Sequence, residues 1–140
     1  FYGWGPSYRQ SFSDWVFNNL KMNHSIVLFD DIFYTPIYMG RLIQIVHQLF
    51  ERCAAGVFHV VGDERVSKYE FAVQLAATFG LNQKLISTGS GISQPNRVAR
   101  PQDMSLSNKK VSAELGIYIG SIKEHLVLMS ESHDAELESL

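Results

Sequence analysis

The chain has 140 residues with 12 basic and 14 acidic side chains, which gives a formal charge of −2. This near-neutral charge argues against nucleic acid as a partner, because nucleic-acid-binding domains carry a basic patch or stripe. The composition, 46 % hydrophobic and 19 % charged, is typical of a globular domain. No apolar run approaches the roughly 18–20 residues of a membrane helix. We therefore expect a cytoplasmic protein that binds neither nucleic acid nor membrane.

The first half of the chain predicts two helices and two strands. Apolar residues at helical spacing predict one helix over Ser11–Leu20 and another over Met39–Cys53. The apolar run Ile26–Phe29 predicts a strand buried on both faces, and the proline that follows favours an extended chain over Phe33–Pro36. The run Val57–Val61, bounded by glycines, is the clearest strand in the sequence. The residues expected to face inward on the second helix are Leu42, Val46, Leu49 and Phe50, with Ile43 and Ile45 beside them.

Two capping boxes mark helix starts in the second half. Ser67–Glu70 predicts the start of a helix that ends at Gly80, and Ser121–Glu124 predicts the start of the terminal helix. Between them we expect a short strand over Leu85–Ile86 and a short helix over Asn108–Leu115.

Two segments predict no regular structure. Ser87–Asp103 is rich in glycine, serine and proline and contains Arg97 and Arg100. A loop of this length inside a domain is usually functional. The acidic tail from Ser130 is expected to fray into solvent.

The alternation of helices and strands predicts an α/β fold. The two clearest strands are apolar without the alternation of a free-standing antiparallel sheet, so they need neighbours on both sides. We therefore expect part of the sheet to lie outside this chain, and the first residue, Phe1, is not an initiator methionine.

The residues on their own show no catalytic or metal-binding constellation. The glycine pairs Gly3/Gly5 and Gly89/Gly91 lack the third glycine of a dinucleotide loop and are expected to form turns. The histidines have no metal-ligand spacing, and His59 is expected to be a hydrogen-bonded core or rim residue. The single cysteine, Cys53, is expected to be a small buried apolar residue. No Gly-x-Ser-x-Gly or Tyr-x-x-x-Lys pattern occurs.

Six short sequence segments nevertheless occur in the order and spacing of a known protein family. They are Phe1–Gly5 (FYGWG), Asp31–Tyr38 (DIFYTPIY), Gly56–Glu64 (GVFHVVGDE), Ser67–Ala72 (SKYEFA), Ala99–Leu106 (ARPQDMSL) and Ser107–Lys110 (SNKK). Together they resemble the carboxyl-terminal part of an extended short-chain dehydrogenase/reductase, a Rossmann-type fold. The likeness is greatest to the dTDP-4-dehydrorhamnose reductase group, and it covers about Phe1–Leu126.

The resemblance implies that residues 1–129 are the sugar-nucleotide-binding segment of such an enzyme, followed by a tail over 130–140. The segment would be incomplete without an upstream Rossmann domain. That domain would bind NAD(P) and supply the tyrosine and lysine for reduction of a 4-keto nucleoside-diphosphate sugar. This chain alone would then carry no catalytic, cofactor-binding or metal-binding residue.

The resemblance also implies residues that contact the nucleoside-diphosphate sugar. Arg100 matches the family arginine that holds the diphosphate, and Arg97 is a second candidate. The role suits a planar, permanently charged guanidinium, although both could be surface arginines. The strand carrying Val27 and Phe29 resembles the one along which the nucleobase lies, with a plain core strand as the alternative. Trp4 and Trp15 would wall the sugar pocket; Trp15 could instead be core, and Trp4 is expected to be exposed.

Two departures from the family pattern leave other functions open. Arg41-Leu42-Ile43 stands where relatives often carry an aspartate, and no second diphosphate-binding arginine occurs near Tyr34. The alternative is a non-catalytic regulatory relative, similar to the β subunit of methionine adenosyltransferase, which would meet a partner protein. A homo-oligomer and an independent helical adaptor domain remain further possibilities.

Overall fold

The computed structural model describes residues 1–6, 8–91 and 101–138. Its helices are α1 (Phe12–Lys21), α2 (Met39–Glu51), α3 (Lys68–Thr78), α4 (Lys109–Leu115) and α5 (Ile122–Glu138), with a 3₁₀ turn, η1, at Gln83–Leu85. Its strands are β1 (Ile26–Phe29), β2 (Phe33–Tyr34), β3 (Val66–Ser67) and β4 (Ile86–Gly89). Arg97 and Arg100 lie outside the described residues.

The strands form two small pairs. β1 and β4 run parallel, from Ile26 opposite Ile86 to Phe29 opposite Gly89. β2 and β3 are antiparallel. Single parallel bridges join Tyr2 to Tyr38 and Phe33 to Asp103. The chain is therefore an α/β protein, rich in helix and with few short strands, as the sequence predicts.

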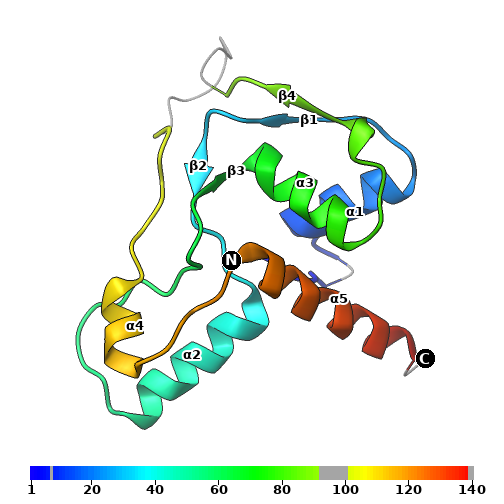
Figure 1. The fold of residues 1–140 in the computed structure, drawn as a ribbon. Helices are drawn as coiled ribbons and strands as arrows, with labels where there is room; N and C mark the ends of the chain where they lie inside the picture. Colours follow the sequence, from blue (N-terminus) through cyan, green and yellow to red (C-terminus); the bar gives the residue numbers. More distant parts are fainter. Residues whose placement is uncertain (7, 92–100, 139–140) are drawn as a thin grey trace.

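The main core lies beneath the β1–β4 pair. Figure 1 shows α1 and α3 on one side of this pair, and α3 contacts α1, α5, β1 and β4. Phe71 of α3 is fully buried, and its ring lies 4.8 Å from the ring of Tyr2 and 5.8 Å from that of Phe12. Both helices begin with a capping box: α3 at Ser67, as predicted, and α1 at Ser11, where the box with Asp14 is not among the predicted ones.

The other face of the pair is open within the described residues. Ile26 and Leu28 of β1 are buried, but Val27 is 63 % exposed. The prediction of a strand buried on both faces is therefore wrong for this chain, because helices cover only one side of β1 and β4.

A second core joins α2, α4 and the segment before α5. Its buried residues are Ile37, Ile45, Val111, Leu115 and Ile119. On α2 the inward residue is Ile45, with Leu42 and Leu49 partly buried beside it. Ile43, Val46 and Phe50 are exposed, so the predicted inward face of this helix is rotated from the observed one.

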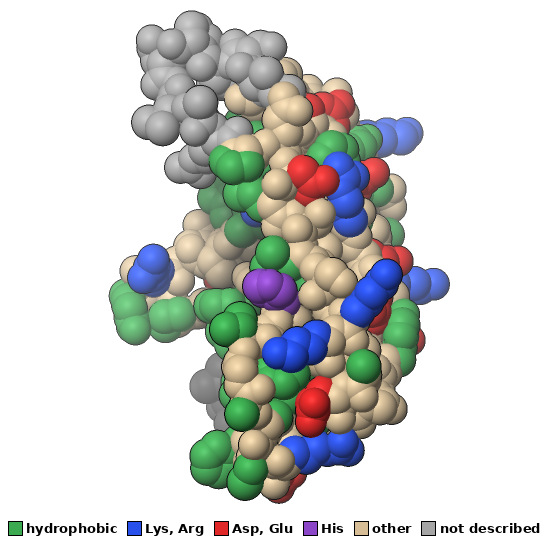
Figure 2. All heavy atoms as spheres, turned by 90° about the vertical axis from the view of Figure 1, so that its left-hand side faces the viewer, with side chains coloured by type: hydrophobic (Ala, Val, Ile, Leu, Met, Phe, Trp, Pro, Cys, Tyr) green, Lys and Arg blue, Asp and Glu red, His purple; other side chains and the backbone are tan. Residues whose placement is uncertain are grey.

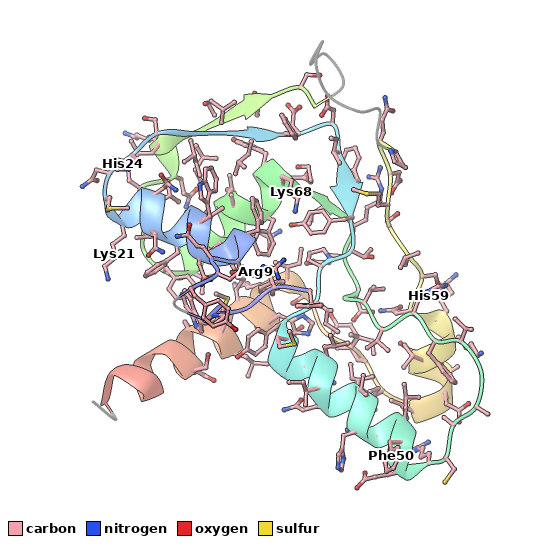
Figure 3. All side chains as sticks on the ribbon, turned by 180° about the vertical axis from the view of Figure 1, so that it is seen from behind. Arg9, Lys21, His24, Phe50, His59 and Lys68 are labelled. Atoms are coloured by element: carbon pink, nitrogen blue, oxygen red, sulfur yellow. The ribbon has the colours of Figure 1, made fainter. Side chains whose placement is uncertain are left out.

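The run 57–61 forms no strand, although the sequence predicts a strand there more clearly than anywhere else. Phe58 and Val60 pack against the second core, whereas Val57 and His59 are exposed. This alternation is that of a strand, but no described strand lies beside the run to complete it. Figure 2, drawn from the side of α4, shows hydrophobic side chains on this surface. His59 lies at the rim in Figure 3, and the described residues give it no hydrogen bond.

Two further details differ from expectation. Cys53 is exposed, not buried, because the chain turns away from the core at its positive φ of 50° just after α2. The terminal helix continues to Glu138, past Ser130, where the sequence predicts fraying. Within the described ranges, none of the helices combines the length and apolar composition of a membrane span.

His125 of α5 is a buried histidine that the sequence does not single out. It is 1 % exposed, and its Nε2 donates to the Ile119 carbonyl at 3.1 Å, because a carbonyl only accepts. Nδ1 has no described partner. Burial, more than any other cause, lowers the pKa of His125 from its usual value near 6.5.

The chain should therefore lose stability in mild acid through His125. Above about pH 6.5 the residue is neutral in both states; below it, the unfolded chain binds a proton that the folded site resists. We expect the melting temperature of the wild type to fall as the pH drops from 7 to 5.5, and the fall to be smaller in His125→Gln. His24→Gln, at an exposed histidine, is the control. An equal fall in all three proteins would contradict this assignment.

Candidate functional site

The carboxyl ends of β1 and β4 lie at one edge of the parallel pair. β1 ends at Phe29 and β4 ends at Gly89, directly opposite each other. In open α/β sheets, ligands bind beside this edge. Asp31, just after β1, accepts a hydrogen bond from the Gly91 amide at 2.8 Å and so joins the two strand ends.

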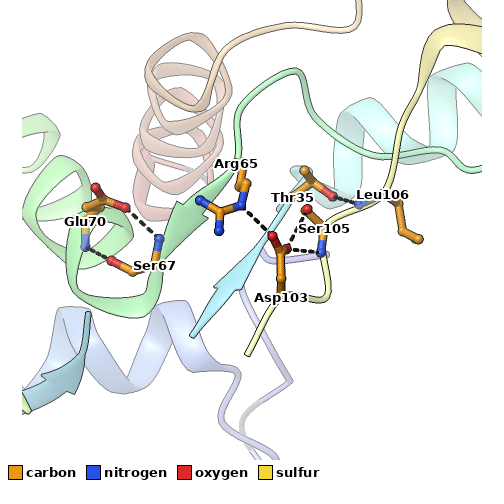
Figure 4. Close-up of polar contacts among 7 residues, drawn as sticks. All are labelled: Thr35, Arg65, Ser67, Glu70, Asp103, Ser105 and Leu106. Atoms are coloured by element: carbon orange, nitrogen blue, oxygen red, sulfur yellow. Dashed lines mark hydrogen bonds and ion pairs between the residues drawn. The ribbon is translucent and has the colours of Figure 1, made fainter. Parts of the chain in front are cut away.

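The chain that follows residue 100 returns to the same edge. Phe33 of β2 donates its amide to the Gln102 carbonyl at 2.7 Å, and its own carbonyl accepts from the Met104 amide at 2.9 Å. The Leu106 amide then bonds to the Thr35 hydroxyl at 3.1 Å, as Figure 4 shows. The residues that flank 92–100, the stretch containing Arg97 and Arg100, are thus fastened beside the edge at both ends.

An ion pair also holds the segment after residue 100 beside β2. Arg65 Nε lies 2.8 Å from Asp103 Oδ2, and the guanidinium lies 3.6 Å from the centroid of the Phe33 ring. The second oxygen of Asp103 accepts from the hydroxyl and amide of Ser105 (Figure 4). Hydrogen bonds from Ser105, followed by Arg65, lower the pKa of Asp103 to about 2. The carboxylate therefore stays charged and Arg65 stays paired at physiological pH.

A lysine and two aromatic rings lie beside β2. The Lys68 ammonium is 4.1 Å from the centroid of the Phe12 ring and 4.2 Å from that of Tyr34. Figure 3 shows Lys68 at the start of α3, next to β2. Burial lowers the pKa of Lys68 and raises that of Tyr34, so the phenol stays neutral.

The capping box fixes Lys68 in this place. The Ser67 amide donates to Glu70 Oε2 at 2.7 Å, and the Glu70 amide donates to Ser67 Oγ at 3.1 Å (Figure 4). Ser67 also pairs with Phe33 through β2 and β3. The first residue of α3 is thereby held against β2.

The two predicted tryptophans have different surroundings. Trp15 is partly exposed, and its ring stacks on Phe12 at 6.4 Å, next to Lys68. Trp4 is half-buried, not exposed as expected: its indole N–H donates to the Met129 carbonyl at 3.0 Å, and its ring packs edge-on against Phe17. A ligand contact by either tryptophan stays a prediction.

The two predicted strand residues also separate. Val27 lies on the open face of β1, away from the helices. Phe29 lies at the carboxyl edge, where a Cβ added to Gly91 would meet its ring at 3.2 Å. Phe29 is therefore next to the start of the segment that contains Arg97 and Arg100, whereas Val27 is not.

Sequence reasoning missed Arg65 and Lys68. Arg65 supplies a guanidinium beside β2, over the Phe33 ring. Lys68 follows a capping serine, which is its only signal in the sequence. Both reach the edge through the β2–β3 pairing, which joins segments more than 30 residues apart.

Two glycines of the predicted pairs pack closely against other parts of the chain. A Cβ on Gly5 would lie 2.5 Å from the Arg9 carbonyl oxygen, and one on Gly91 would lie 2.3 Å from Ile32 Cδ1. Contacts within the chain therefore require glycine at both positions. No group of three metal-binding side chains comes together among the residues that the structure places.

Comparison with known proteins identifies the relatives of this chain. A probable low-salt glycan biosynthesis reductase, Agl14 of Haloferax volcanii, is 25 % identical over 118 residues, which are 84 % of this chain and 39 % of that protein. The dTDP-4-dehydrorhamnose reductase of Bacillus anthracis, solved with NADP, superposes with a TM-score of 0.81 at 19 % identity, covering 94 % of this chain and 45 % of that one. A hypothetical dTDP-4-dehydrorhamnose reductase of Sulfolobus tokodaii gives 0.67 at 25 % identity, covering 81 % and 41 %.

This chain spans less than half the length of each of these relatives. The neighbours have the Rossmann-like architecture of the predicted enzyme class, which agrees with the α/β arrangement described above. Residues 2–134 match the family described as the RmlD substrate binding domain, almost the full length of the chain. The chain belongs to the RmlD substrate-binding domain family.

Proposed function

We propose that this chain is the substrate-binding half of an NAD(P)-dependent reductase that acts on a 4-keto nucleoside-diphosphate sugar. The family match over residues 2–134 carries the proposal. The names of the relatives support it, since Agl14 is called a reductase and the Bacillus anthracis enzyme was solved with NADP. No observation favours the regulatory-subunit alternative. A cytoplasmic location and a homo-oligomer stay predictions.

In this proposal the sugar nucleotide lies along the carboxyl edge of β1 and β4. Arg100, and with it Arg97, would bind the diphosphate, because a guanidinium can donate two parallel hydrogen bonds to phosphate oxygens. Phe29 lies beside the start of that segment. Trp15, stacked on Phe12, would offer an aromatic wall.

The reduction itself would belong to the upstream half. NAD(P) supplies a hydride when it is bound, and the glycine pairs of this chain lack the third glycine of a dinucleotide loop. The contribution of this chain is to bind and orient the sugar nucleotide. Productive orientation alone can account for a large part of an enzymatic rate enhancement.

The upstream half would also complete the sheet. Residues 57–61 alternate inward and outward like a strand, yet in the described structure they donate no backbone–backbone hydrogen bond. Their position is set by side chains: Lys110 Nζ donates to the Val57 carbonyl at 2.8 Å, and Asn108 Nδ2 to the Val61 carbonyl at 3.2 Å. An extended apolar segment whose amides have no described backbone partner can pair with an added strand.

Hydrogen exchange should reveal that neighbour. We expect the amides of residues 57–61 to exchange rapidly in the 140-residue chain and on the order of 100-fold more slowly in the gene product that contains the upstream half. The amides of Phe71–Leu75 in α3 are the control, because they should be protected in both. Rapid exchange of 57–61 in both proteins, with α3 protected, would show that no strand is added.

The function is tested by the same gene product with NADPH and dTDP-4-dehydrorhamnose. We expect NADPH oxidation that saturates with the sugar nucleotide. Arg100→Ala should raise KM about 10- to 100-fold, because a charge-assisted hydrogen bond contributes about 1.5–3 kcal/mol, and should change kcat less. Arg100→Lys should be intermediate, since it keeps the charge but not the fork. Absence of both turnover and sugar-nucleotide binding would refute the function; unchanged kinetics in Arg100→Ala would refute only this residue's role.

A further inference from the structure

The ammonium of Lys68 has no described carboxylate partner. The described ion pair at the edge joins Arg65 to Asp103, and the neighbouring acid, Glu70, accepts a hydrogen bond from the Ser67 amide. The only described partners of the ammonium are the faces of Phe12 and Tyr34. Ring faces attract a cation but do not use up its three N–H donors as oxygen acceptors would.

Two features of the position work against a positive charge. Lys68 is half-buried, and burial lowers the pKa of its ammonium. It is also the first residue of α3 after the Ser67 cap, where the positive end of the helix dipole opposes a cation.

An exposed lysine would avoid these costs by turning its ammonium to water, as long lysine side chains generally do. Lys68 instead lies across Phe12 of α1 and Tyr34 of β2, beside the carboxyl edge. The two rings limit its conformations, which lowers the entropy that a ligand would have to remove on binding. An anionic group would neutralise the charge of the ammonium and accept hydrogen bonds from its N–H groups.

We propose that Lys68 binds an anionic oxygen group of the ligand, a phosphate or a carboxylate, from its seat on the Phe12 and Tyr34 rings. This inference rests on the proposed function, since it assigns a further contact to the same sugar nucleotide.

Calorimetric titration of the complete gene product tests the proposal, with pyrophosphate, UDP-glucose and UDP-glucuronate as probes. We expect Lys68→Met to weaken binding of at least one anionic probe about 10- to 100-fold, and Lys68→Arg to restore most of the affinity. Lys84→Met, at an exposed lysine, is the matched control and should bind as the wild type does. Equal loss for all three probes identifies a phosphate; loss confined to UDP-glucuronate identifies the sugar carboxylate. Unchanged affinities in a folded Lys68→Met protein would overturn the proposal.

Carbon-13 NMR of the wild type covers the case in which Lys68→Met does not fold. The Cε resonance of Lys68 should be displaced by the two rings, and it should shift on titration with the effective anion but not with uridine. Bound anion should also raise the pKa of the ammonium. No shift at saturating pyrophosphate and UDP-glucuronate would overturn the proposal. Pyrophosphate binding that depends on Lys68, in a protein that shows neither turnover nor sugar-nucleotide binding, would support this inference and refute the proposed function.

Discussion

The arrangement of the candidate site depends on the hydrogen bonds of Ser67. Its hydroxyl and amide close the capping box with Glu70, and its backbone pairs with Phe33 across β2 and β3. One buried residue therefore fixes where α3 begins and where β2 lies. Because α3 packs against α1, α5 and the β1–β4 pair, its starting point sets the geometry of the main core and of the edge above it.

Arg65 and Lys68, two described cations at this edge, differ in whether a carboxylate neutralises their charge. Arg65 pairs with Asp103 and lies over the Phe33 ring, so its charge holds the segment that contains Asp103 near β2. The described partners of Lys68 are aromatic faces alone. The β2–β3 pair is therefore flanked by one cation that pairs with a carboxylate and one that pairs with none among the described residues.

Local signals in the sequence predicted the helices well. The capping boxes at Ser67 and Ser121 and the spacing of Val16 and Leu20 were sufficient, because they act within one or two turns. The predicted strand over 57–61 does not form because an apolar strand needs a neighbouring strand, which the described chain does not supply. Two-residue strands such as β3 are too short to show a period, so the placement of Arg65 and Lys68 was not foreseeable. The family resemblance, confirmed by the comparisons, located the binding half, whereas Arg97 and Arg100 lie outside the described residues.

The indole of Trp4 connects parts of the molecule that are distant in sequence. Its N–H bonds to the Met129 carbonyl of α5, and its ring meets Phe17 of α1 and Phe79 just after α3. Three helices thus converge on a single ring in the glycine-flanked opening segment. A displacement of α5 at Met129 would change the surroundings of that ring, so the intrinsic fluorescence of Trp4, measured with Trp15 replaced by phenylalanine, would report motion of this helix without an added label.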